Sequence, residues 1–231
     1  MTHPVSIPDR LFEQLKTAIF EGDIPVGSKL SEPELARDYQ VSRGALREAI
    51  ARLEACRLVT RKTNVGARVV ELSAQNLMEI FLVRESLEGM AARLAAQHIT
   101  DEEVATLEAL LEQHEQDIEN SEDHAYFQKE GDLDFHYQIV LASHNTTLFN
   151  LLCNDLYQLV RLYRYQFGMR SNRASQAFNE HRHIIAAIKR GDGEMAEHIM
   201  RAHIRASRDS VEAIFLNERN TQMTGTHDNL S

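Results

Sequence analysis

The chain of 231 residues contains two cysteines, four prolines and no tryptophan. Cys56 and Cys153 lie far apart in helical patterns, which indicates buried thiols and excludes a secreted domain held together by disulfides. No apolar run reaches the roughly 18 residues that a membrane-spanning helix needs. No signal-peptide pattern of a basic start, apolar core and small-residue cleavage site is present. These absences predict a cytoplasmic protein that does not have a membrane as its partner.

The prolines also divide the chain, because all four lie within the first 33 residues and residues 73–216 contain none. Residues 1–72 show helical periods over 9–21, 32–39 and 43–56, followed by two short strand patterns joined by a Thr-Asn-Val-Gly turn. Three helices and a hairpin predict a winged helix-turn-helix domain. Longer helical periods follow over 74–97, 101–119, 123–142, 147–167, 174–190 and 193–216. The fold class is therefore mainly α: a winged helix-turn-helix over 1–72 and an all-α bundle of about six helices over 73–216. The polar residues 217–231 are predicted to be disordered.

Basic charge is scarce overall, because the net charge of the chain is -10. Residues 37–68 nevertheless hold 8 Lys or Arg against 3 Asp or Glu, whereas residues 73–231 hold 14 against 25. This local excess coincides with the second helix of the helix-turn-helix, where Arg43 and Arg47 project from one face. An exposed basic helix start beside an apolar anchor is typical of a helix that enters the DNA major groove. The predicted DNA contacts are Arg37, Ser42, Arg43, Arg47, Asn64 and Gly66.

With these motifs in this order, the chain resembles the GntR family of bacterial transcription regulators. The resemblance is to its FadR-like branch, which has an FCD-type all-helical effector domain. Residues 36–53 (Ala-Arg-Asp-Tyr-Gln-Val-Ser-Arg-Gly-Ala-Leu-Arg-Glu-Ala-Ile-Ala-Arg-Leu) resemble its DNA-binding signature, and residues 63–69 (Thr-Asn-Val-Gly-Ala-Arg-Val) resemble its wing. Residues 83–96 resemble the first effector-domain helix, while residues 132–139 and 180–192, with His203, resemble the metal-site segments. One departure is Ala45, where the family often has proline; alanine is a good helix former, so the change is compatible with a helix start.

A second constellation comprises Asp132, His136, His181 and His203. Asp132 and His136 are four residues apart, so they are neighbours on one helix face. His181 and His203 each lie eleven residues from Asp192, in the break between two predicted helices. Residues equidistant from the turn of an antiparallel helical hairpin lie at the same level, so these imidazoles can face each other. Scattered histidines are the plainer interpretation, since the chain has eleven. Three imidazoles and a carboxylate suit a divalent metal, Zn first and Ni or Mn as alternatives.

Arg84 falls on the apolar stripe of the helix predicted over 74–97. An inward arginine is costly unless it is paired. Its partner is either Glu88, one helical turn on, or the carboxylate of a small effector held by the metal; the sequence leaves both open. Arg161 is a second, weaker candidate for effector binding.

These features together predict a DNA-binding transcription regulator, not an enzyme, that binds a metal and responds to a ligand. The resemblance implies a small carboxylic acid as effector, control of small organic-acid metabolism, and repression as the commoner sense. Double-stranded operator DNA is the expected partner, and a homodimer is expected because paired half-sites match a two-fold protein. The alternatives are a sensor of the metal itself and a metal-dependent hydrolase, which the same ligands could serve by activating water.

Overall fold

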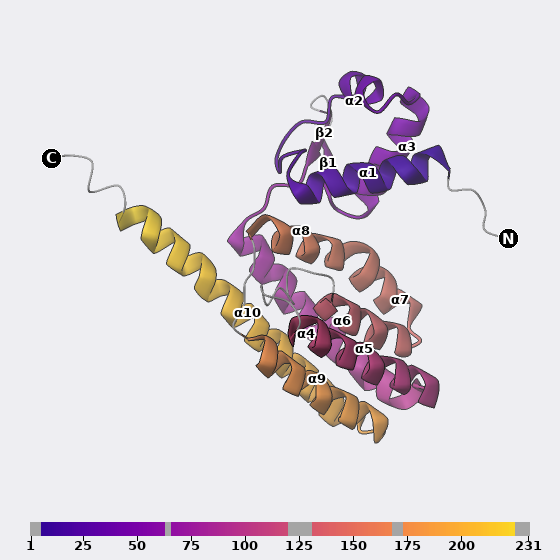
Figure 1. The fold of residues 1–231 in the computed structure, drawn as a ribbon, viewed down its shortest axis with the longest axis vertical. Helices are drawn as coiled ribbons and strands as arrows, with labels where there is room; N and C mark the ends of the chain where they lie inside the picture. The colour runs from indigo at the N-terminus through magenta and orange to yellow at the C-terminus, as the bar shows by residue number, and fades with distance from the viewer. Residues whose placement is uncertain (1–5, 63–65, 120–130, 168–172, 225–231) are drawn as a thin grey trace. The chain divides into compact units, whose positions relative to one another are not determined.

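The computed structural model describes residues 6–62, 66–119, 131–167 and 173–224, which form two compact units. The first unit contains residues 1–72 together with residues 150–168, and the second contains residues 73–149 and 169–231. Each unit is largely helical (Figure 1). None of the described helices is long and apolar enough to cross a membrane.

The first unit is a winged helix-turn-helix. Its elements are α1 (Ile7–Glu21), α2 (Glu32–Asp38), α3 (Arg43–Ala55), β1 (Val59–Lys62) and β2 (Gly66–Val69). The strands are antiparallel, with Val59 paired to Val69 and Lys62 to Gly66. Ser6 and Asp9 form a capping box at the start of α1, and Gln40 turns the chain between α2 and α3 with a left-handed φ of 54°. The three predicted helices and the hairpin are confirmed.

The core of this unit includes a residue from far along the chain. Leu162 has no exposed surface and belongs to the same cluster as Leu15, Ile19, Leu46 and Ile50. It lies on α8 (Tyr157–Phe167), which follows the π-helical segment η1 (Asn150–Leu156). The helical period predicted over 147–167 is therefore present, but a π-helical stretch interrupts it.

A polar contact also joins α8 to the end of α1. The Gln166 side-chain amide donates to the backbone carbonyls of Ile19, at 3.3 Å, and Phe20, at 3.0 Å. Both carbonyls belong to the last helical turn, where no intrahelical donor remains. The Tyr165 ring stacks on Phe20 with centroids 5.4 Å apart. Residues 150–168 thus supply both apolar and polar support to the unit that contains α3.

Leu162→Ala is expected to destabilise the first unit by about 2–5 kcal/mol, the usual cost of removing a buried leucine side chain. Leu151→Ala is the matched control because Leu151, on η1, is 41 % exposed. We expect faster amide hydrogen exchange in α1 and α3 for Leu162→Ala and no change for the control. Unchanged exchange in both variants would contradict the inclusion of α8 in this core.

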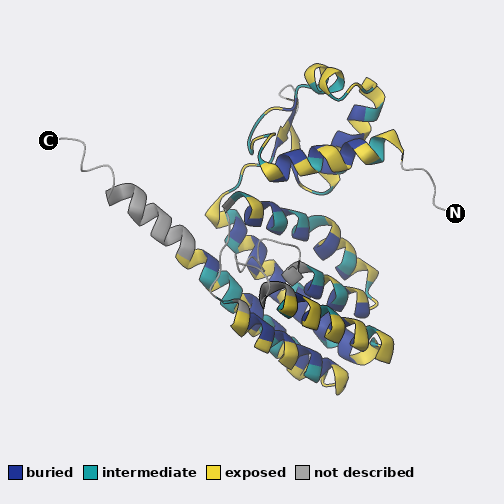
Figure 2. Ribbon diagram, in the orientation of Figure 1, coloured by how far each residue is buried: buried dark blue, intermediate teal, exposed yellow. Residues whose placement is uncertain are grey.

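The second unit is a helical bundle around one central helix. Its elements are α4 (Ala74–His98), α5 (Asp101–Glu119), α6 (Gly131–Ala142), α7 (Thr146–Phe149), α9 (Ala174–Lys189) and α10 (Gly193–Thr224). Helix α4 packs against α6, α9 and, most extensively, α10. Figure 2 shows buried residues, in dark blue, along these helices. Gly89 permits the close approach of α10, because a Cβ there would lie 2.6 Å from Arg201 Cγ.

The ends of α6 and α10 bear on two of the sequence predictions. The first part of the period predicted over 123–142 lies outside the described residues, and α6 is described from Gly131. The prediction of disorder over 217–231 is wrong for Asn217–Thr224, which continue α10 as helix. Extending a formed helix requires no new nucleation, so a polar segment without Gly or Pro can continue it. Residues 225–231 lie outside the described residues.

Candidate functional site: a buried histidine cluster and a basic recognition helix

Three histidines from three helices converge inside the second unit. His136 lies on α6, His181 on α9 and His203 on α10, and each is at most 1 % exposed. His203 Nε2 lies 3.2 Å from His136 Nε2 and 3.3 Å from His181 Nε2. All three ligand atoms lie within 4.8 Å of one another. The predicted grouping of these histidines is therefore present, while the side chain of Asp132 lies outside the described residues.

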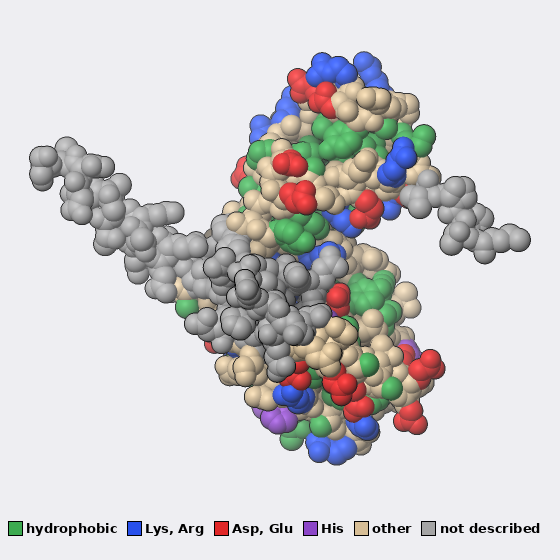
Figure 3. All heavy atoms as spheres, viewed as in Figure 1, with side chains coloured by type: hydrophobic (Ala, Val, Ile, Leu, Met, Phe, Trp, Pro, Cys, Tyr) green, Lys and Arg blue, Asp and Glu red, His purple; other side chains and the backbone are tan. Residues whose placement is uncertain are grey.

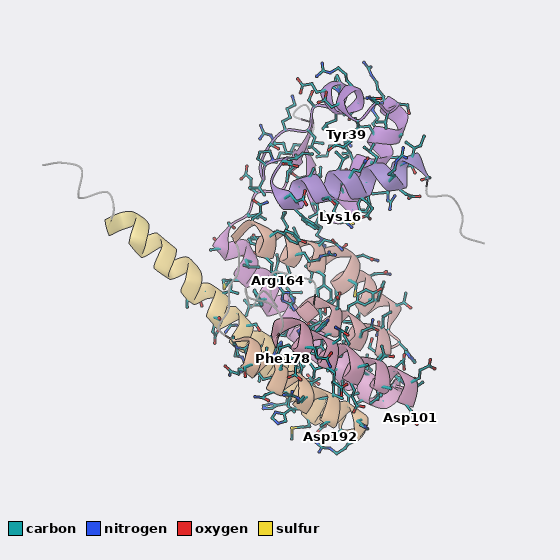
Figure 4. The ribbon with its side chains drawn as sticks, in the orientation of Figure 1. Lys16, Tyr39, Asp101, Arg164, Phe178 and Asp192 are labelled. Carbon is teal, nitrogen blue, oxygen red and sulfur yellow. The ribbon has the colours of Figure 1, made fainter. Side chains whose placement is uncertain are left out.

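The hairpin of α9 and α10 aligns His181 with His203. Gly191, with a left-handed φ of 71°, turns the chain between the two helices. Phe178 and Asp192, labelled in Figure 4, mark the course of α9 and the turn that follows it. Phe135 stacks on the His181 ring with centroids 3.9 Å apart, and this contact fixes the plane of the imidazole. Equal spacing from the turn thus predicts the pairing correctly.

Carboxylates lie behind two of the imidazoles. His136 Nδ1 lies 2.7 Å from Glu88 Oε2, and His203 Nδ1 lies 2.6 Å from Glu180 Oε2. Burial tends to raise the pKa of Glu88, but the neighbouring Arg84 and His136 side chains outweigh it and lower the pKa to about 2. An ionised carboxylate can only accept hydrogen bonds, so it favours the tautomer of a neighbouring neutral imidazole that carries its proton on Nδ1. In the neutral form that binds metals, the Nε2 atoms of both rings present lone pairs to the centre of the cluster.

Two lone pairs that face each other at 3.2 Å repel unless a proton or a metal ion lies between them. Zn–N bonds of about 2.0–2.1 Å at tetrahedral angles place two nitrogen donors about 3.3–3.4 Å apart. The observed Nε2 separations of 3.2 and 3.3 Å match this value closely. The donor set, its tautomers and its spacing therefore fit a nitrogen-coordinated divalent metal.

Each supporting carboxylate is itself held by an arginine. Arg84 Nε donates to Glu88 Oε1 at 2.6 Å, and both residues are 1 % exposed. Arg173 donates to both oxygens of Glu180, at 2.5 and 2.7 Å, and these contacts help to lower the pKa of Glu180 against the effect of burial. Two parallel relays result, each running from an arginine through a glutamate to a histidine of the cluster. This arrangement is typical of the residues that orient histidine ligands in metal sites.

Sequence reasoning named Glu88 only as an alternative partner of Arg84 and gave no role to Glu180 or Arg173. Glu180 directly precedes His181, but its carboxylate supports His203 on the neighbouring helix. No spacing within one helix indicates such a contact. His183 and His198, near the ligands in sequence, are both exposed and lie outside the cluster.

Arg161 is placed in the first unit, on α8. Its guanidinium carbon lies 5.7 Å from the centroid of the Phe20 ring, and burial lowers the pKa of this arginine. The structure thus groups Arg84 with the three histidines and groups Arg161 with α1.

The second site is the exposed start of α3. Ser42 caps the helix by accepting a hydrogen bond from the Ala45 amide at 3.2 Å, which leaves its hydroxyl hydrogen available to a phosphate. Arg43 is exposed one residue later. Arg47 is 65 % exposed, and its Nε donates to Glu32 Oε2 on α2 at 2.8 Å. The basic face is therefore open, with one of its arginines oriented by a carboxylate.

The flanking residues extend this surface. Arg37 on α2 is 75 % exposed and pairs with Asp38 at 3.2 Å. Gly66 begins β2 with a left-handed φ of 93°, a conformation that favours glycine at the wing. Asn64, also predicted at the wing, lies outside the described residues. Figure 3 shows Lys and Arg side chains gathered around the α2 end of this unit.

Comparison with known protein families decides the identity. Residues 8–69 match the family of bacterial regulatory proteins named gntR, and residues 79–206 match the FCD domain. The chain belongs to the GntR family of transcription regulators, in its branch with an FCD domain. This assignment confirms the resemblance, the winged helix-turn-helix and the all-helical effector domain of this GntR regulator.

Individual relatives agree with the assignment. The chain is 33 % identical over 196 residues to the HTH-type transcriptional regulator YdhC of Bacillus subtilis, covering 84 % of this chain and 86 % of that protein. It is 31 % identical to a protein of Paenarthrobacter nicotinovorans described as a probable D-xylose utilization operon transcriptional repressor, covering 81 % of each. Escherichia coli McbR/YncC has a similar fold, with a TM-score of 0.70 and 22 % identity over 92 % of this chain and all of that one.

Proposed function

We propose that this GntR regulator is a cytoplasmic repressor that binds operator DNA as a homodimer and responds to a small carboxylic acid through a bound divalent metal. The convergence of three buried imidazole Nε2 atoms, two of them backed by carboxylates, carries this proposal. The regulated genes would serve small organic-acid metabolism. A relative that bears the name of a repressor supports the proposed sense of regulation.

His136, His181 and His203 would hold the metal, together with Asp132 one turn before His136 on α6. Zn fits this donor set best, and Ni or Mn are the alternatives. The bound cation would supply positive charge and an open coordination position for the oxygens of an organic acid. Glu88 and Glu180 would hold the protons of the supporting imidazoles at Nδ1, which would leave the Nε2 lone pairs free to bind the cation.

Arg84 would act through Glu88 and not as the main anchor of the effector. Its side chain is 2 % exposed, and it makes a direct 2.6 Å ion pair with Glu88. A buried carboxylate that loses its arginine partner typically costs about 3–5 kcal/mol of stability. The ion pair therefore accounts for an inward arginine without requiring a ligand. Arg161 stays a candidate effector contact from the sequence.

Arg84→Met is expected to lower the free energy of unfolding by about 3–5 kcal/mol, because it leaves Glu88 buried without its principal cation. We expect the metal-loaded variant, once folded at low temperature, to bind the acid with unchanged affinity. Arg84→Lys, which keeps the charge, is the control and should lose less stability. Thermal unfolding and calorimetric titration with citrate, malate and lactate measure both effects. Normal stability with abolished acid binding would instead make Arg84 the effector anchor.

The same titrations distinguish this function from its alternatives. An acid-responsive regulator should release operator DNA only when metal and acid are both present, as measured by fluorescence anisotropy. A metal sensor should change its operator affinity on addition of metal alone. Turnover of small esters by the metal-loaded protein would indicate the hydrolase, for which the family of transcription regulators gives no support.

A further inference from the structure

A polar hollow of about 580 Å³ lies between α1 and the turn that joins α2 to α3. Arg10 and Gln14 line it from α1, and Gln40 and Ser42 line it from the turn. All four residues are exposed. Of the DNA contacts that the sequence predicts among the described residues, only Ser42 belongs to this lining. The other lining residues therefore have no assigned role in binding.

Arg10 is a cation in a place where its own helix does not need one. It lies in the first turn of α1, where the helix dipole favours acidic side chains and disfavours basic ones. Asp9 supplies the acidic group there, in the capping box with Ser6. Within the described part of the chain, Arg10 forms no ion pair and no side-chain hydrogen bond. Its guanidinium group therefore does little for the stability of α1 and remains available to a ligand.

The rest of the lining favours an anion. Ser42 uses its hydroxyl oxygen to cap α3, so the hydroxyl hydrogen is left to donate. Gln14 and Gln40 each carry a side-chain NH₂ group that donates. Asp38 is the acidic residue of the lining, and its carboxylate pairs with Arg37 at 3.2 Å, which offsets its charge. Phosphate oxygens accept hydrogen bonds from guanidinium, amide and hydroxyl groups alike.

The position of the hollow favours the DNA backbone over a free small molecule. Ser42 is the N-cap of α3, the helix proposed to enter the major groove, and the phosphates of both strands flank that groove. A pocket for a small molecule typically buries about 70–90 % of the surface of its ligand. A lining of exposed polar side chains does not enclose a ligand in this way, but it suits a phosphate on the surface of a duplex.

We infer that this hollow binds a phosphate group of the DNA backbone, with Arg10 as the cation that pairs with it. The inference rests on the proposed function, because it places α1 beside the DNA strand that flanks α3. It adds α1 to a DNA-binding surface that otherwise consists of α2, α3 and the wing. A phosphate contact carries no sequence information, so this one strengthens binding to every duplex.

Arg10→Ala should weaken binding of the full-length chain to a short duplex of arbitrary sequence, measured by fluorescence anisotropy at several salt concentrations. The salt slope should become shallower by about 0.9 for each chain bound, because one phosphate is no longer neutralised. At 0.1 M salt this slope corresponds to a loss of roughly fivefold to tenfold in affinity per chain. Arg10→Lys, which keeps the charge, should retain most of the slope. Thermal unfolding of Arg10→Ala should occur no lower than in wild type, since the variant removes an unfavourable charge from the helix start.

Gln14→Glu provides a second variant, because it places a carboxylate in the hollow. Thr17→Glu is the matched control, since it adds the same charge at an exposed position one turn later on α1, outside the lining. Gln14→Glu should weaken binding to the same duplex about fivefold more than Thr17→Glu does, because it also repels the bound phosphate. Equal losses in the two variants would reflect a general effect of negative charge and would overturn the inference.

Inorganic phosphate distinguishes the two sources of the anion. Calorimetric titration of phosphate into the protein without DNA should show no binding tighter than millimolar. Tighter binding that Arg10→Ala removes, together with an unchanged salt slope on DNA, would assign the hollow to a free phosphorylated ligand and overturn the inference. Wild-type DNA affinity and salt slope in Arg10→Ala would also overturn it, and would leave the proposed operator recognition by Arg43 and Arg47 standing. A wild type that binds no duplex contradicts both.

Discussion

His203→Ala is expected to abolish tight binding of the divalent metal. His203 Nε2 is the atom within 3.2 Å of His136 Nε2 and 3.3 Å of His181 Nε2, so its loss removes the shared neighbour of the other two donors. Ligand binding that is restricted to the folded state stabilises it by about 4 kcal/mol at a thousandfold excess over Kd. Wild type should therefore unfold at a clearly higher temperature with zinc than without it, and His203→Ala should show no such shift.

Elemental analysis after dialysis against a weak chelator measures the metal content directly. We expect about one equivalent per chain in wild type and almost none in His203→Ala, by the coordination chemistry of such sites. His183→Ala is the matched control on α9, because His183 is exposed, and it should retain both the metal and the thermal shift. Metal that remains bound after His181 and His203 are both replaced would exclude the site.

Substitution of Glu180, whose carboxylate supports His203, is expected to weaken metal binding without abolishing it. Glu180→Gln keeps the size of the side chain but removes the charge that accepts the His203 Nδ1 proton. Replacement of such supporting residues typically weakens metal affinity by about 10–100-fold. We therefore expect a loss intermediate between wild type and His203→Ala. Lowering the pH should weaken metal binding in all forms, because protons compete with the metal for the imidazoles.

Much of this histidine cluster was predictable because it depends on helical repetition. The hairpin turn at Gly191 fixes the level of every residue pair on α9 and α10, so equal spacing from Asp192 suffices to pair His181 with His203. The inward position of Arg84 was equally readable from the apolar stripe of its helix. Such inferences succeed where one regular element, or one short turn, determines the geometry.

Contacts between distant elements were not predictable in this way. Nothing in the pattern of residues 147–167 indicates that Leu162 packs among the core residues of α1 and α3, because an apolar helix face does not identify the surface that it covers. The π-helical stretch of η1 likewise has no periodic signature. The Arg173–Glu180–His203 relay joins side chains from different helices, so it required the three-dimensional structure.

The basic surface of α2 and α3 was predictable only in part. Its helices could be predicted from the sequence, but the orientation of its arginines could not. The structure adds the ion pair between Arg47 and Glu32, with Arg61 Nη1 also 3.7 Å from Glu32. A carboxylate from α2 therefore restrains the rotamer of a basic side chain on α3. Arginine that is held in this way loses less conformational entropy when it contacts a base edge or a phosphate.

Arg43→Ala and Arg47→Ala are each expected to remove most of the preference for the operator over unrelated DNA. A good bidentate contact to a base is worth about 1–3 kcal/mol, which corresponds to roughly 5- to 150-fold in affinity per half-site. Each substitution acts twice in a dimer, so the operator affinity should fall by a larger factor. Binding to unrelated sequences should change much less. Fluorescence anisotropy with operator and scrambled duplexes at several salt concentrations measures both quantities.

Substitutions of two other arginines distinguish recognition of the base sequence from attraction to the charged DNA backbone. Arg37→Ala should weaken binding to both duplexes and make the salt slope shallower by about one for each phosphate that is no longer neutralised, as expected for a side chain that binds the DNA backbone. Arg57→Ala removes the same charge from a side chain that pairs with Asp155, and it should leave the operator preference intact. Full operator preference in both Arg43→Ala and Arg47→Ala would mean that α3 is not the recognition helix. A loss of operator preference that is confined to Arg43→Ala and Arg47→Ala would assign base recognition to the exposed start of α3. There the capped helix end presents Arg43, and the carboxylate of Glu32 orients Arg47.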